Sequence, residues 1–187
     1  MEQAHAHPGT LWTIGHSTRP WEMFVDMLRE AGIAQLVDVR RFAGSRRNPQ
    51  FSSLAMAPAL VQAGVAYIAM PELGGRRPPQ PDSPNGAWRV AAFRGYADYM
   101  ATPDFQGARA RLMQLANAEV TAVMCAEAVW WQCHRRLIAD DFAARDWQVL
   151  HLMSPGRMQP HPLNPAARMR DGVLRYPPAD DGQAALF

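Results

Sequence analysis

The chain has 187 residues, of which 48% are hydrophobic, and its formal net charge is +2 at pH 7. This length suits one domain with a well-buried core, and so small a charge argues against a general nucleic-acid coat. Two cysteines are too few for a disulfide framework, no apolar run approaches a membrane span, and the start lacks the apolar core of a signal peptide. We therefore expect a cytoplasmic protein with free thiols and without a membrane partner.

All 19 basic residues are arginine. Codons rich in G and C explain this bias as base composition, whereas planar guanidinium groups would also suit phosphate and carboxylate ligands. Three pairs could form a local positive patch despite the low net charge. These pairs are Arg40-Arg41, Arg46-Arg47 and Arg76-Arg77.

Strands and helices alternate from the start of the chain. Residues 11–14 are a short apolar strand, and residues 20–28 carry an apolar stripe at helical spacing. Ser17 or Thr18 is expected to cap that helix. Residues 33–39 are almost wholly apolar, which predicts a second central strand.

The next segment is richer in loops. Residues 41–53 read as a basic loop with Gly and Pro, 53–62 as a helix, and 65–70 as a third strand. Residues 71–88 hold so many Pro and Gly residues that we expect an irregular segment, and a loop of that length is usually functional or disordered.

The second half continues the alternation. Helices are predicted at about 89–100 and 103–116, followed by a β-branched apolar strand at 120–124. Residues 133–145 then have a helical pattern, and 147–152 form a fifth strand.

The domain boundaries follow from this pattern. Residues 1–9 are expected to be a flexible N-terminus, 10–165 an α/β domain that ends in a loop-rich segment, and 166–187 a C-terminal extension. The last residues, 180–187, read as a loose or partner-docked tail. We see no second domain.

Parallel strands need crossover connections, which the intervening helices supply. The predicted fold is α/β, a single domain with a three-layer, doubly wound, mostly parallel five-stranded sheet. In the order 3-2-1-4-5, strands 1, 2 and 4 would lie side by side. Ligands bind at the carboxyl ends of the strands in such sheets, at the point where the strand order reverses.

Reactive side chains follow these three strands. A thiol at the end of a strand, near a helix amino terminus and arginines, would be stabilised as a thiolate, so Cys125 is either a nucleophile or an inert buried thiol. Glu127 is a general acid or base, an anchor, or a carboxylate that the helix dipole favours. The residues expected together at this edge are His16, Ser17, Asp38, Arg40, Cys125 and Glu127.

The start of the helix at 133–145 carries a second set. Arg135 conflicts with the helix dipole there, which indicates a partner, either Glu127 or a bound anion. Cys133 and Arg135 could instead be packing residues. Adjacent Cys133 and His134 point in different directions on a helix, and no zinc spacing occurs, so no metal site is predicted.

Three further features accompany this set. Trp130 and Trp131 are either a stacking surface for a base or sugar or a hydrophobic plug. Arg94 is expected to lean over the pocket, or else to face solvent. His151 and His161 are weaker candidates, more typical of satisfied histidines in a core or loop.

Several motifs in one order resemble the domain of unknown function 488 family over about residues 10–165. The resemblance implies the fold and the location of the site rather than a reaction. The family usually has a polar link between its last two motifs, whereas Ala128-Val129-Trp130-Trp131-Gln132 stands here, which would change the substrate. The motifs are Thr13-Ile14-Gly15-His16-Ser17, Asp38-Val39-Arg40, the segment Tyr67 to Gly74 with Pro71-Glu72-Leu73-Gly74, Phe93-Arg94-Gly95-Tyr96, Cys125-Ala126-Glu127 and Cys133-His134-Arg135.

Our first hypothesis is an enzyme, a hydrolase or transferase, that acts on a phosphate-bearing ligand such as a nucleotide or a nucleic-acid end. The alternatives are a non-catalytic nucleic-acid-binding module and a redox or metal-handling protein. No Gly-x-Gly-x2-Gly or P-loop pattern occurs, so the sequence indicates no dinucleotide or ATP cofactor. The catalytic candidates are His16, Asp38, Cys125 and Glu127, and the anion-binding candidates are Ser17, Arg40, Arg94, Cys133, His134 and Arg135.

Overall fold

The computed structural model describes residues 9–179. Most of the predicted flexible N-terminus and the tail expected at 180–187 lie outside these residues. Within the described part, the chain is an α/β protein with a mostly parallel six-stranded sheet and five α-helices. The α/β class predicted from the alternation of strands and helices is therefore confirmed.

The strand order in the central sheet is β3-β2-β4-β1-β5-β6. The first five strands are parallel, and β6 runs antiparallel to β5 at one edge. The strands are β1 (Thr10–Gly15), β2 (Gln35–Asp38), β3 (Ala66–Ala69), β4 (Thr121–Cys125), β5 (Gln148–Ser154) and β6 (Arg157–Pro160).

Two predictions about the sheet were wrong. The order 3-2-1-4-5 fails because β4 lies between β2 and β1. Both β1 and β4 are buried along their whole length, so their apolar patterns could not decide which is central. The loop-rich segment at 153–165 also contains a sixth strand, which pairs with β5 through a turn at Gly156, where φ is +67°.

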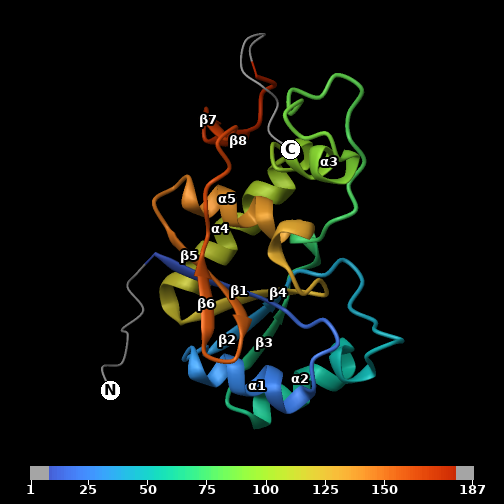
Figure 1. The fold of residues 1–187 in the computed structure, drawn as a ribbon, viewed down its shortest axis with the longest axis vertical. Helices are drawn as coiled ribbons and strands as arrows, with labels where there is room; N and C mark the ends of the chain where they lie inside the picture. The colour runs from blue at the N-terminus through green and yellow to red at the C-terminus, as the bar shows by residue number, and fades with distance from the viewer. Residues whose placement is uncertain (1–8, 180–187) are drawn as a thin grey trace.

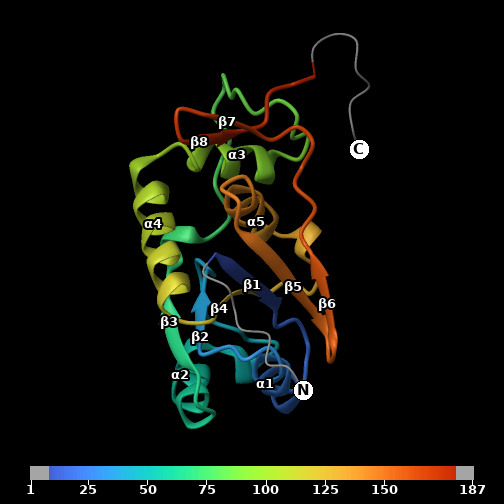
Figure 2. The same ribbon diagram turned by 90° about the vertical axis from the view of Figure 1, so that its left-hand side faces the viewer.

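Helices cover both faces of the sheet. Figure 1 shows α1 (Trp21–Glu30) and α2 (Ser53–Gln62) on one side, and Figure 2 confirms this placement. On the other side lie α3 (Ala91–Tyr99), α4 (Pro103–Ala118) and α5 (Arg135–Ala143). Each side has its own apolar core, the first built on Phe24, Leu28, Met56 and Leu60, the second on Tyr96, Phe105, Leu112, Leu137 and Phe142.

The start of α1 differs from the prediction. The N-cap residue is Pro20, which makes no side-chain capping bond, so the expected cap at Ser17 or Thr18 was wrong. Ser17 instead has φ of +48°, and its N–H donates to the Ala126 carbonyl. Its backbone is therefore bound to the segment that follows β4 rather than to the helix.

Short elements complete the described chain. They are the 3₁₀ turns η1 (Pro49–Phe51), η2 (Pro71–Leu73) and η3 (Trp130–Gln132) and the hairpin β7 (Arg168–Arg170) with β8 (Val173–Arg175). After this hairpin, Tyr176 is fully buried, and its hydroxyl donates to Asp140 of α5 at 2.8 Å. Among residues 9–179, no helix is both long and apolar enough to cross a membrane.

Candidate functional site

The carboxyl ends of β2, β4 and β1 meet at one edge of the sheet, with β4 in the middle. Backbone hydrogen bonds continue past the strand ends, from His16 N to the Cys125 carbonyl at 3.0 Å and from Val39 N to the Met124 carbonyl at 3.0 Å. Because β4 separates its neighbours, Cys125 is central at this edge, between the chain at His16 and the chain at Asp38.

Asp38 and Arg40 form a buried bidentate pair. Arg40 Nε donates to Asp38 Oδ1 at 2.9 Å, and Arg40 Nη2 donates to Oδ2 at 2.7 Å. The Tyr67 hydroxyl donates to the same Oδ2 at 2.6 Å, and burial raises the pKa of Tyr67 above its usual value, so it remains a donor. Sequence reasoning did not identify Tyr67 as part of this cluster.

His16 is held between Arg40 and its own chain. Its Nε2 lies 3.1 Å from Arg40 Nη1, and its Nδ1 lies 2.9 Å from the Ser17 carbonyl oxygen. Since a guanidinium only donates, Nε2 is the acceptor and Nδ1 carries the proton. Burial lowers the pKa of His16 to about 4, with the Arg40 charge acting in the same direction, so the ring is neutral at pH 7. The ring also stacks on Phe51.

The two thiols of the chain touch each other. Cys125 Sγ and Cys133 Sγ are 2.7 Å apart, both cysteines are free, and their residues are only 2% and 4% exposed. Cys133 precedes α5, and the N–H of Arg135 points at its sulfur at 3.5 Å.

The pKa values of the two thiols move in opposite directions. Burial raises the pKa of Cys125 well above its usual value, and its hydrogen bond to Cys133 adds to this shift. Burial acts on Cys133 in the same sense, but the Cys125 hydrogen bond and the Arg135 charge outweigh it and lower the pKa to about 7. Cys133 is therefore the thiol that ionises first, although Cys125 was the predicted nucleophile.

Arg135 is 1% exposed and donates in three directions. Its Nε reaches Cys125 Sγ at 2.9 Å, Nη1 reaches Thr13 Oγ1 at 3.1 Å, and Nη2 reaches the Glu127 carbonyl at 2.7 Å. Gly15 makes this arrangement possible, because a Cβ there would overlap the Glu127 carbonyl oxygen. The dipole conflict predicted Glu127 or a bound anion as the partner of Arg135, and in the structure the partners are the Cys125 sulfur, the Thr13 hydroxyl and the backbone carbonyl of Glu127.

A buried chain of hydrogen bonds continues from Thr13. His151 Nδ1 lies 2.6 Å from Thr13 Oγ1, His151 Nε2 lies 2.9 Å from His161 Nδ1, and His161 Nε2 lies 2.8 Å from Asp140 Oδ1. With Asp140 as the terminal acceptor, every proton position is fixed, and Thr13 donates to His151 while it accepts from Arg135. No local spacing in the sequence signals this chain, because its members lie on β1, β5 and α5 and in the segment after β6.

Trp130 and Trp131, the aromatic pair expected at the rim of the pocket, differ in burial. Trp130 is buried and stacks on His151 at 4.6 Å between ring centroids, with an interplanar angle of 7°. Its indole N–H donates to Gln159 at 3.3 Å. Trp131, by contrast, is exposed. Trp130 therefore covers the histidines and does not offer a stacking face to solvent.

The remaining predicted residues lie at the margin of this cluster. The side chain of Glu127 is exposed, and it is the backbone carbonyl of this residue that contacts Arg135. Arg94 donates to the Trp88 carbonyl at 3.2 Å. His134 Nδ1 lies 3.5 Å from Cys133 Sγ, and its ring packs against Tyr96.

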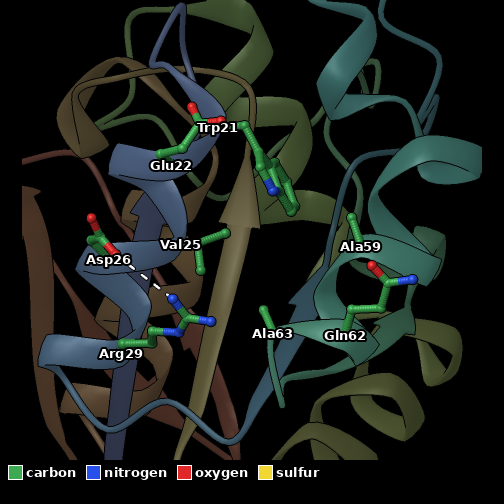
Figure 3. A pocket seen from close by; sticks show the side chains of 8 residues that line it. All are labelled: Trp21, Glu22, Val25, Asp26, Arg29, Ala59, Gln62 and Ala63. Carbon is green, nitrogen blue, oxygen red and sulfur yellow. Dashed lines mark ion pairs between the residues drawn. The ribbon is translucent and has the colours of Figure 1, made fainter.

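Two surface hollows lie away from these residues. Figure 3 shows the first, between α1 and α2, where the side chains of Trp21, Glu22, Arg29 and Gln62 surround an open cleft. The second is lined by η2 and α4. Neither is lined by a predicted site residue. Within residues 9–179, no group of three or more His, Cys, Asp or Glu side chains is arranged to hold a metal ion.

Comparison with known proteins bears on the family to which the chain belongs and not on its reaction. The comparison with curated proteins finds no match, and neither does the comparison with solved structures. A family model described as "Domain of unknown function DUF488" matches residues 20–142, which is more than half of the chain. The matched region runs from the start of α1 to the last turn of α5 and so includes the Asp38–Arg40 pair and both thiols. The chain therefore belongs to the domain of unknown function 488 family.

Proposed function

We propose that the chain is an enzyme whose reaction begins with the Cys133 thiolate as nucleophile, and that its substrate carries a phosphate group. The observation that carries the proposal is the contact of two thiols, 2.7 Å apart, with a guanidinium 2.9 Å from one of them. This geometry favours one ionised sulfur, because one thiol can donate its S–H to the other while Arg135 supplies a charge that it cannot lose. The lowered pKa of Cys133 and the raised pKa of Cys125 identify Cys133 as the ionised thiol and Cys125 as the S–H donor.

The backbone adds to the stabilisation of the Cys133 thiolate. The sulfur lies at the amino end of α5, where unpaired N–H groups and the helix dipole favour negative charge. His134 Nδ1, at 3.5 Å, is the nearest base for the thiol proton. Burial lowers the pKa of His134, which keeps its ring neutral at pH 7 and makes it a weaker base than a free imidazole.

Surface arginines, rather than the buried ones, support the proposal that the substrate bears a phosphate. Arg40, Arg94 and Arg135 were expected to hold the anion, and each donates to a protein acceptor. Arg41 and Arg76 are near the same edge and are free of carboxylate partners among the described residues, as the ion pairs of residues 9–179 involve other arginines.

A second candidate function is a dithiol redox reaction, which the direct sulfur–sulfur contact favours. Loss of two electrons and two protons to an acceptor such as a small organic disulfide would join Cys125 and Cys133 without a large movement. In this case Cys133 attacks the acceptor and Cys125 resolves the mixed disulfide.

The decisive experiment is a pH titration of thiolate ultraviolet absorbance, which needs no access of a reagent to the buried sulfurs. The wild type should show one thiol that ionises near pH 7, and this step should vanish in Cys133→Ser. In Cys125→Ala, the Cys133 step should move to higher pH because the S–H donor is gone. If both thiols of the wild type ionise above pH 8.5, or if the early step persists in Cys133→Ser, the proposed nucleophile is wrong.

The same two variants separate the candidates. A dithiol reaction with oxidised glutathione should give a wild-type product lighter by two hydrogens in mass spectrometry. Cys125→Ala should stop at a glutathione adduct, because Cys133 attacks but nothing resolves the mixed disulfide, and Cys133→Ser should form no adduct, because the attacking thiol is gone. A protein that forms only adducts, with no internal disulfide, would exclude the redox function and leave the nucleophile in place.

A further inference from the structure

A basic surface with an exposed aromatic ring lies where the loop after β2 meets the loop after η2. We call it the Phe42 surface, and it consists of Arg41, Phe42, Arg76 and the adjacent Arg77. Phe42 is 65% exposed, which is unusual for a phenylalanine. The guanidinium carbons of Arg41 and Arg76 lie 5.7 Å and 5.9 Å from its ring centroid, so the ring is flanked by cations from both loops.

The two loops are fixed against each other. Arg41 Nη1 donates to the Arg76 carbonyl at 3.0 Å, across 35 positions of the chain. Gly74 allows the close approach, because a Cβ there would lie 2.7 Å from Arg41 Cβ and 2.8 Å from the Arg41 nitrogen. The ring and its two cations are therefore held in place before any partner arrives, which lowers the entropic cost of binding.

The charge of this surface is not neutralised within the protein. Among residues 9–179, none of its arginines is within ion-pair distance of a carboxylate, whereas Arg40, Arg109 and Arg145 all are. Clustered arginines without carboxylates attract phosphates, and an exposed aromatic ring among them offers a face for stacking. This combination suits a ligand in which phosphates alternate with flat aromatic groups.

The Phe42 surface adjoins the thiols. A Cβ on Gly75, beside Arg76, would lie 2.9 Å from His134 Nδ1, and that nitrogen is 3.5 Å from Cys133 Sγ. The basic loop therefore passes directly over the residue next to the proposed nucleophile. A ligand held on the loop would have its end near Cys133.

We propose that the Phe42 surface binds the end of a single-stranded nucleic acid, with an unpaired base stacked on Phe42 and the neighbouring phosphates on Arg41 and Arg76. A duplex fits less well, because its base faces are already stacked. The inference rests on the proposed function for the phosphate-bearing class of ligand and names that ligand. Binding itself does not require the Cys133 thiolate, so the two can be tested apart.

The test is fluorescence anisotropy with the full chain and a labelled oligothymidylate of about ten nucleotides, since an OB-fold-sized site spans about 4–16. Phe42→Ala should weaken binding roughly 5- to 150-fold, the range for loss of one stacked base. The double substitution Arg41→Ala with Arg76→Ala should flatten the dependence of log affinity on log salt by about 1.4, or about 0.7 for each phosphate contact.

Matched controls come from the opposite edge of the sheet, where Arg157 and Met158 are exposed on β6. Arg157→Ala and Met158→Ala should leave affinity within about twofold of the wild type. Absence of binding, equal weakening by these controls, or a duplex bound as tightly as the single strand would overturn the inference. Circular dichroism of each variant separates a lost contact from a lost fold.

The Cys133→Ser variant keeps the two proposals distinguishable. It should bind the oligonucleotide as the wild type does, because the sulfur lies beneath the loop rather than on it. A failed thiolate titration would then remove the nucleophile and leave the binding surface. Failed binding by a protein with a normal titration would remove the surface and leave the nucleophile.

Discussion

Replacing Arg135 with methionine should raise the pKa of Cys133 and remove the pH dependence of stability that this thiol creates. The pKa of Cys133 is about 7 in the folded protein against a reference value of 9.0. A group whose pKa is lowered on folding contributes stability that is fully present above its unfolded pKa and is lost as the pH falls through its folded pKa. Below pH 7 both states hold the proton, so the contribution is absent there.

The magnitude follows from the same difference. Two pKa units correspond to about 3 kcal/mol of unfolding free energy, which should accumulate between about pH 7 and pH 9. Above pH 9 the rise should reverse, because the pKa of Cys125 is raised by burial and its unfolded form loses a proton that the folded form keeps. Arg135→Met should abolish most of the rise. It should also lower stability by about 1–3 kcal/mol, because the Glu127 carbonyl loses its Arg135 donor, whereas the Thr13 hydroxyl keeps its bond to His151.

The assay is urea unfolding at half-unit steps from pH 6 to pH 9.5, with the thiolate absorbance of each sample recorded in parallel. Arg136→Met is the matched control, because it makes the same substitution on the next residue of α5, whose guanidinium lies over Trp88 rather than near a sulfur. A wild-type stability that stays flat from pH 7 to pH 9, or a rise that survives in Arg135→Met, would refute the assigned electrostatics.

Three further predictions concern other parts of the site. Gly15→Ala should prevent stable folding, as the added Cβ overlaps the Glu127 carbonyl, whereas Gly107→Ala faces open space and should raise the melting temperature; equal melting temperatures would contradict this contact. Stability should fall as the pH drops from 6.5 to 4, because the lowered pKa of His16 means that the unfolded chain binds its proton first, and His16→Gln should reduce that fall in acid titration. Asp140→Asn should cost about 1–3 kcal/mol in denaturant unfolding, because the amide cannot accept every bond that the carboxylate now accepts, and an unchanged midpoint would count against the buried chain.

Local patterns predicted most of the elements but not their neighbours. The helix expected at 53–62 is present with those bounds, because apolar spacing and a terminal glycine act within a few residues. The place of β4 between β2 and β1 is decided by long-range pairing, and two equally apolar strands gave no preference. The predicted edge was nevertheless right, since the strands whose ends carry His16, Asp38 and Cys125 are adjacent in either order.

The sequence indicated a side-chain partner only where a residue type was unfavourable at its own position in a helix or strand. A cation at the amino end of a helix is unfavourable, and this signalled a partner for Arg135 before the structure identified it. His151 and His161 carried no such conflict. His151 bonds to Thr13, 138 positions away, and to His161, 10 positions away. Spacing in the sequence alone could therefore not reveal that the two histidines support Thr13.

The two buried arginines at the sheet edge, Arg40 and Arg135, differ in whether a carboxylate balances their charge. Arg40 has a full counter-charge in Asp38, with two guanidinium nitrogens on two carboxylate oxygens, and this pair is electrically complete. Arg135 is as deeply buried, yet no carboxylate in the described chain lies within ion-pair distance of it.

Removing an uncompensated guanidinium from water costs several kcal/mol, which neutral hydroxyl and carbonyl acceptors offset only in part. A sulfur is the remaining partner of Arg135, and a sulfur can become an anion. Ionisation of one thiol would therefore give Arg135 a negative counter-charge, as Asp38 does for Arg40. A buried methionine would avoid this desolvation cost but would leave the Glu127 carbonyl without its donor, and in the proposed function the charge also stabilises the thiolate.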